Sequence, residues 1–142
     1  MEALSRFESG DAEGALTTAD RYRVRHRDGQ FLDRTERVAA RVLRGRGNLA
    51  AARKRLERAA AAVAATDGDA SGDRVEQAEL AYQQGDFEAA DKLFAPLAGR
   101  ADATGARATA GRAWCVAFRR NRSRDQPRLR LYLLLGAQRG KP

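Results

Sequence analysis

Three short segments of the sequence share one pattern, in which glycine followed by Asp or Asn separates two amphipathic stretches. The pairs are Gly10-Asp11, Gly47-Asn48 and Gly85-Asp86, and their glycines lie 37 and 38 residues apart. Glycine readily adopts the left-handed conformation that ends a helix. The Asp or Asn side chain then accepts free amide hydrogens at the start of the next helix. The pattern therefore predicts a helix, a tight turn and a second helix in each segment.

The composition favours helices along the whole chain. Its 142 residues include only three prolines and no isoleucine. Alanine runs such as AAAAVAA at 59–65 have high helix propensity, and stretches with the two-residue period of a strand are scarce. We therefore predict an all-α protein that forms a single domain over residues 1–142.

The repeated segments resemble the tetratricopeptide repeat, a helix–turn–helix unit of about 34 residues. The matching positions are Ala3, Gly10 and Ala15 in the first segment, Ala40, Leu43, Gly47, Leu49, Ala52, Leu56 and Ala59 in the second, and Ala78, Gly85, Phe87, Ala90 and Phe94 in the third. The resemblance implies an α-α superhelix of three to four such repeats, a TPR-like solenoid. Its units would span about 1–29, 30–66 and 73–99, with a degenerate fourth unit at 103–138.

The fourth unit is expected to turn at Asn121. Residues 102–121 have the pattern of an amphipathic helix, and asparagine is able to adopt the left-handed conformation. A last helix would then begin near Asp125, a candidate cap, with Pro127 in its first turn.

Two pairs of carboxylates have the spacing of a capping box at the start of a helix. Asp33 precedes Glu36, and Asp73 precedes Glu76, by three residues. At that separation two side chains reciprocally bond backbone amides. We therefore expect Asp33 and Asp73 to be the N-caps of their helices.

The last predicted helix is too apolar for the solvated end of a stack of repeats. Its leucines are Leu129, Leu131, Leu133, Leu134 and Leu135. Three explanations stay open. The chain is a piece of a longer one, its end is covered by a partner or a second copy, or the helix folds back on the fourth unit. Self-association through this helix is therefore one expectation.

No combination of residues points to catalysis, a cofactor or a metal. The only histidine, His26, is flanked by arginines, and no Cys or His pair has the spacing of metal ligands. Cys115 lies in an apolar run and is expected to be buried and unreactive. We therefore expect a protein that is not an enzyme and that binds no cofactor.

Arginine accounts for 24 of the 27 basic residues, and the net charge is +8. Arg34, Arg37, Arg41 and Arg44 recur at spacings that gather them on one face of a helix. By the family resemblance, this face lines the concave groove of the stack. The alternative is that the arginines form only a solvated face, which is also our interpretation of residues 53–58 on the following helix.

The resemblance places further side chains in the same groove: Glu79, Tyr82 and Gln83 in the third unit, and Phe118 and Arg119 in the fourth. Such a groove suits a peptide with carboxylates or phosphates and one or two apolar anchors. The sequence therefore predicts a protein-interaction scaffold or adaptor. Alone or in a larger assembly, it would bind an acidic or phosphorylated segment of a partner protein.

Nucleic-acid binding is the alternative function, because residues 118–130 are strongly basic and aromatic residues lie near them. The basic charge is interrupted, however. Residues 67–102 carry a net charge of −6, between +5 on residues 1–66 and +9 on residues 103–142. This alternation weakens the nucleic-acid interpretation and is compatible with head-to-tail self-association.

No segment approaches the roughly 20 apolar residues that span a bilayer. The N-terminal residues also lack the basic and apolar regions of a signal peptide. We therefore expect a cytoplasmic protein without a membrane span.

Overall fold

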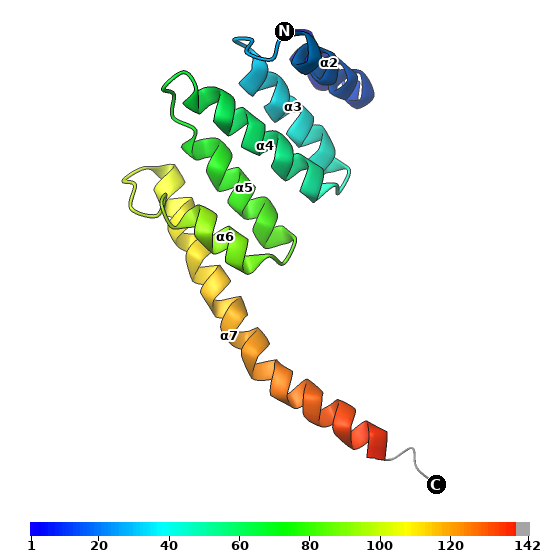
Figure 1. Cartoon of the computed structure of the whole chain (residues 1–142), viewed down its shortest axis with the longest axis vertical. Helices are drawn as coiled ribbons and strands as arrows, with labels where there is room; N and C mark the ends of the chain where they lie inside the picture. The colour runs from blue at the N-terminus through cyan, green and yellow to red at the C-terminus, as the bar shows by residue number, and fades with distance from the viewer. Residues whose placement is uncertain (139–142) are drawn as a thin grey trace.

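The computed structural model describes the chain from Met1 to Gln138, with side chains described as far as Arg122. All of its regular structure in that range is α-helical, which confirms the all-α prediction (Figure 1). The helices are α1 (Glu2–Glu8), α2 (Ala12–Arg25), α3 (Leu32–Gly45), α4 (Leu49–Ala64), α5 (Ser71–Gln83), α6 (Phe87–Phe94) and α7 (Ala103–Gln138).

The three predicted Gly-Asp/Asn turns are present. Gly10, Gly47 and Gly85 have φ angles of +86°, +75° and +78°. The Asp or Asn that follows each glycine accepts a hydrogen bond from the backbone amide three residues later, at 2.8, 3.2 and 3.1 Å. Its own amide donates to the carbonyl five residues earlier, at 2.8, 2.9 and 3.0 Å. These are the bonds of a Schellman C-cap joined to a side-chain N-cap, so α1–α2, α3–α4 and α5–α6 are tight helical hairpins.

Replacing Gly85 with alanine should destabilise the fold by about 1–2 kcal/mol, because a side chain is disfavoured in the left-handed region. A Cβ at this position would meet no atom within 4 Å, so the cost comes from the backbone conformation alone. Gly72→Ala in the first turn of α5 is the matched control: it has equal space and no positive φ, and should be neutral or slightly stabilising. Urea denaturation compares the two, and equal effects would contradict this explanation.

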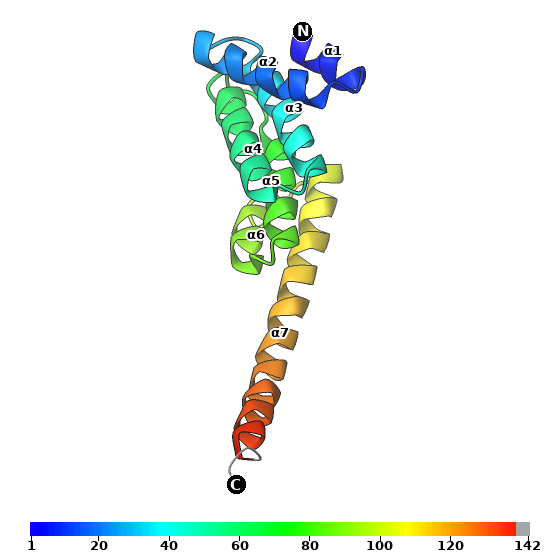
Figure 2. The same cartoon turned by 90° about the vertical axis from the view of Figure 1, so that its right-hand side faces the viewer.

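The helices follow one another through the molecule in chain order (Figure 1). Each helix packs against the next, and α1 also contacts α3 while α5 contacts α7. α7 is the exception in length. Its first half lies against α5 and α6, and its second half continues beyond them (Figure 2).

Small side chains dominate the core, which allows the helices to approach closely. Between α1, α2 and α3 the buried residues are Ala3, Ala15, Ala19, Val38, Ala39 and Val42. Between α3, α4 and α5 they are Ala40, Ala52, Leu56 and Leu80. The third cluster joins α5 and α6 to α7 and consists of Val75, Ala78, Ala81, Ala90, Phe94, Leu97, Ala108 and Cys115.

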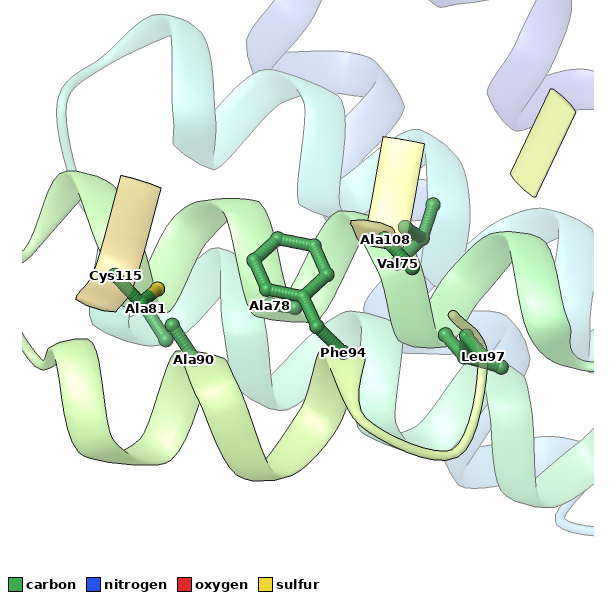
Figure 3. Packing of buried hydrophobic residues seen from close by; sticks show 8 residues of the cluster. All are labelled: Val75, Ala78, Ala81, Ala90, Phe94, Leu97, Ala108 and Cys115. Atoms are coloured by element: carbon green, nitrogen blue, oxygen red, sulfur yellow. The ribbon is translucent and has the colours of Figure 1, made fainter. Parts of the chain in front are cut away.

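Phe94 is the largest side chain of the third cluster, and its ring lies beside Ala78 of α5 (Figure 3). α7 crosses this ring at Gly111. A Cβ on Gly111 would lie 2.4 Å from Cζ of Phe94. The absence of a side chain at Gly111 therefore lets α7 lie directly on the aromatic ring.

The turn predicted at Asn121 is wrong, because α7 is one continuous helix from Ala103 to Gln138. Asp125 and Pro127 accordingly lie inside α7 and do not begin a new helix. The three hairpin turns all contain glycine at a positive φ. Asparagine adopts this conformation less readily than glycine, and the arginine neighbours of Asn121 are good helix formers. The leucines on which self-association was predicted lie outside the described side chains.

The predicted capping boxes at Asp33 and Asp73 are also wrong. α3 begins two residues earlier than expected, after Phe31, and α5 three residues earlier, after Ala70; neither of these residues caps its helix with a side chain. Asp33 and Asp73 instead lie within the first turns, and both accept hydrogen bonds from Arg37. Asp73 is thereby bonded across helices, and Asp33 is bonded to a residue one turn further along α3.

Candidate binding surface

A cleft of about 350 Å³ opens between α5 and α7, above Phe94. Its lining comprises Glu79, Tyr82 and Gln83 from α5, Phe94 from α6, and Arg107, Ala110, Gly111 and Trp114 from α7. Glu79 and Arg107 face each other with paired hydrogen bonds of 2.9 and 2.8 Å. The cleft is therefore largely apolar, with one fixed ion pair in its wall.

Four aromatic rings continue from this cleft along α7. Tyr82 contacts Phe118 edge to face, with ring centroids 5.9 Å apart, and Phe118 stacks on Phe87 at 5.5 Å. Trp114 lies 6.4 Å from Phe118. The side chains of Trp114 and Phe118 are 60% and 44% exposed. Such exposed aromatic residues are typical of binding surfaces.

The structure thus brings together four of the predicted groove residues, Glu79, Tyr82, Gln83 and Phe118. Arg119 lies elsewhere. It faces α6, where its Nη1 is 3.8 Å from Asp91. The sequence prediction did not include Arg107 and Trp114, because the assumed register of the fourth unit was anchored on a turn at Asn121 that does not exist.

The guanidinium of Arg37 forms hydrogen bonds to two carboxylates of its own chain. Its Nε and Nη2 donate to the two oxygens of Asp73 at 2.7 and 2.9 Å, and its Nη1 donates to Asp33 at 2.9 Å. The hydrogen bond to Asp73 raises the pKa of Arg37, against the effect of burial. Since Asp73 belongs to α5 and is buried, Arg37 ties α3 to α5 and is not available to a ligand.

The other arginines of the stripe differ from Arg37. The guanidinium of Arg34 lies over the ring of Phe31 at 5.9 Å from its centroid. Arg41 and Arg44 are exposed and make no ion pair with the described side chains. These two lie 38 residues before Glu79 and Tyr82, which is the spacing of the glycine turns. They therefore occupy the equivalent face of the preceding hairpin.

A buried ion cluster was not predicted. Glu36 of α3 is fully buried, and both of its oxygens lie 3.3 Å from Nη1 of Arg55 in α4. Arg55 also donates to Asp20 of α2, and Arg23 lies 3.7 Å from Glu36. Burial lowers the pKa of Arg55, but the bonds to Asp20 and Glu36 outweigh it and raise the pKa.

The interpretation of residues 53–58 as a solvated face is wrong for Arg55, because the side chain of Arg55 is only 12% exposed. A signal for both positions was present in the sequence. Glu36 falls in the apolar stripe with Ala39, Ala40 and Leu43, and Arg55 lies in the stripe with Ala52, Leu56 and Ala59. A charged residue in an apolar stripe indicates a buried ion pair.

Cys115 is buried, as the sequence predicted, in the cluster around Phe94 (Figure 3). Burial raises the pKa of its thiol, and the nearby Asp91 adds to the effect. A thiol in this setting is a poor nucleophile. Within the described residues, no group of three His, Cys, Asp or Glu side chains is placed to hold a metal ion.

Comparison with models of protein families, with curated proteins and with solved structures found no match. None of the described helices combines the length and apolar character needed to cross a bilayer.

Proposed function

We propose that this chain is a protein-interaction scaffold whose hairpins form a tetratricopeptide-like superhelix. Three observations support the architecture. The same glycine turn recurs at intervals of 37 and 38 residues, the helices pack in chain order, and α1 and α5 each contact the helix two positions further on. The scaffold binds an acidic or phosphorylated peptide segment.

The observation that carries this proposal is a pair of exposed arginines that make no ion pair with the described side chains. Arg41 and Arg44 lie exposed on α3 at the repeat positions of Glu79 and Tyr82. A guanidinium binds carboxylate or phosphate through two parallel hydrogen bonds. The cleft at Tyr82 and Trp114 accepts an apolar anchor from the same segment. The two arginines thus select a ligand with negative charge, and the cleft holds the apolar side chain of that ligand.

Nucleic-acid binding is the second candidate, and the exposed Trp114 and Phe118 on a basic helix favour it. Two features of the cleft favour a peptide. Glu79 would place a carboxylate near any phosphate bound in the cleft. The arginine in the wall of the cleft, Arg107, is already paired with Glu79.

The charge-reversal variant Arg41→Glu/Arg44→Glu should weaken binding of a fluorescein-labelled peptide that carries Glu, phosphoserine and one Leu. We expect a loss of at least about tenfold in affinity, since a hydrogen bond to a charged group contributes about 1.5–3 kcal/mol. Fluorescence anisotropy measures the change. Arg58→Glu, at an exposed position of α4, is the matched control and should bind as the wild type does.

A peptide with Lys in place of Glu and unmodified serine tests the dependence on charge. A labelled oligothymidylate tests the alternative. If Arg58→Glu loses as much affinity as the double variant, the surface on α3 is not a specific site. If the oligonucleotide binds more tightly than the peptide and is released steeply by salt, nucleic-acid binding replaces the proposed function.

A further inference from the structure

Another cavity, of about 550 Å³, lies at the N-terminal end of α3. The α2–α3 loop (residues 26–31), the first turns of α3 and the C-terminal end of α4 form its wall, and we call it the loop pocket. The apolar part of its lining is Leu32, Ala62 and Val63, which are all half-buried. Its volume is within the range of sites that bind small molecules or side chains. The loop pocket shares no residue with the cleft at Trp114.

The wall of the loop pocket is formed in the free chain, because Tyr22 of α2 holds the α2–α3 loop in place. The Tyr22 hydroxyl accepts a hydrogen bond from the backbone amide of Phe31 at 3.3 Å, and the Tyr22 ring lies 4.8 Å from the ring of His26. Gly29 lies against the same hydroxyl, where there is no room for a side chain. A loop that is already ordered loses little entropy when a ligand binds.

Two guanidinium groups in the lining of the loop pocket have no ion-pair partner. Arg27 and Arg34 are exposed and make no ion pair with the described side chains. Arg37 also lies in the lining, but its bonds to carboxylates hold it within the fold. Asp28 is an exposed carboxylate in the same lining and is likewise unpaired. The unpaired groups are thus two cations and one anion, and one further anionic group balances them.

Arg34 connects the loop pocket to the two arginines of the proposed site. Arg34 precedes Arg41 by seven residues, or two helical turns, so both lie on one face of α3 about 10 Å apart along its axis. The guanidinium of Arg34 lies over the ring of Phe31, a contact that leaves its N–H groups free. An extended peptide rises about 3.3 Å per residue. Three residues of such a peptide therefore span the distance between the two arginines.

We propose that the loop pocket is a second anchor site for the peptide ligand of the scaffold. Three residues away from the acidic group at Arg41, the ligand carries a further carboxylate or phosphate, which Arg34 binds. The neighbouring ligand residue is apolar and packs on the apolar part of the loop pocket. The inference rests on the proposed function and adds to it the sequence pattern of the ligand: an apolar residue beside an acidic one, and further acidic residues three positions on.

The test extends the labelled peptide that carries Glu, phosphoserine and one Leu. Two longer peptides each add a Glu three residues beyond the charged residues and a Leu next to this Glu, one at the amino end and one at the carboxyl end, so that both directions of the ligand are covered. One of the two should bind at least about tenfold more tightly than the original peptide in fluorescence anisotropy. An extension with Gly and Ser at these two positions should add no affinity.

Ala65→Glu places a negative charge in the lining of the loop pocket and should remove this gain in affinity, while the original peptide binds within about twofold of its affinity for the wild type. Ala64→Glu is the matched control and should keep the gain, because Ala64 is an equally exposed neighbour that lines a different cavity. Arg34→Glu should also remove the gain. Asp28→Asn should increase it, since the opposing carboxylate is lost. Circular dichroism verifies that the four variants are folded.

A cross-linking experiment locates the added anchor. With benzoylphenylalanine in place of the added Leu, irradiation should join the longer peptide to residues 27–37 or 62–66, as mass spectrometry of the digested product would show. Cross-links confined to α5, α6 or α7 would overturn the inference, because the added anchor would then lie in the cleft at Trp114.

Two further results would overturn the inference and leave the proposed function standing. One is an original peptide that binds while neither longer peptide binds more tightly. The other is a gain in affinity that Ala65→Glu and Ala64→Glu change equally. If the original peptide and both longer peptides fail to bind, the proposed function and this inference are overturned together.

Discussion

Glu36→Ala should destabilise the fold by about 3 kcal/mol, within the range found when one partner of a buried ion pair is removed. Glu36 is fully buried, and its carboxylate is the common partner of Arg55 and Arg23. Its removal leaves two guanidinium groups at the junction of α2, α3 and α4 with Asp20 alone to balance them. Urea denaturation followed by circular dichroism measures the loss.

Glu57→Ala is the matched control, because Glu57 is exposed on α4 and should change stability by no more than about 0.5 kcal/mol. The double variant Glu36→Met/Arg55→Met should recover part of the loss, since the two charges that remain at the junction, Arg23 and Asp20, are partners of each other. A single Glu36→Ala variant as stable as Glu57→Ala would show that the cluster contributes nothing to the junction.

Phe94→Ala should cost about 3–5 kcal/mol, the usual range for a fully buried phenylalanine. Phe94 is 2% exposed and touches residues of α5, α6 and α7 in one cluster. The cavity would loosen α7 from the stack. The fluorescence emission of Trp114, which lies on α7, should therefore change at a lower urea concentration than in the wild type.

A double-mutant cycle with Gly111 tests this contact specifically. Gly111→Ala alone should destabilise by about 1–3 kcal/mol, because its Cβ would lie 2.4 Å from the Phe94 ring. In the Phe94→Ala background the same change meets no ring and should be neutral or stabilising, given the helix propensity of alanine. Additive effects would mean that α7 does not cross the ring at Gly111.

Features that depend on neighbouring residues could be predicted from the sequence. The turns at Gly10, Gly47 and Gly85 are local, since glycine ends one helix and the next residue caps the following one. The burial of Cys115 also follows from an apolar run. The helical class and the positions of these three turns therefore needed no knowledge of tertiary contacts.

Features that depend on distant partners could not be predicted. Arg37 was expected to face a ligand, but its guanidinium is hydrogen-bonded to Asp73, 36 residues away in the sequence. The carboxylate of Asp33 had the spacing of a cap, and the same arginine took it as a partner. Of the candidate site, Tyr82 and Phe118 were expected together and do meet. Trp114 was missed because the face of α7 that packs on α5 and α6 carries Ala108 and Cys115, which leaves Trp114 exposed at the cleft.

The continuity of α7 has a mechanical consequence. A helix of 36 residues is about 54 Å long, and only its first half is held by α5 and α6 (Figure 2). The remainder extends beyond these helices. The contacts of α7 with Phe94 and Asp91 are the pivot about which it would tilt. A tilt of about 10° at that pivot would move the far end, about 40 Å away, by roughly 7 Å, given a rise of about 1.5 Å per residue. A ligand bound beside Trp114 that tilted the helix would thereby displace its other end.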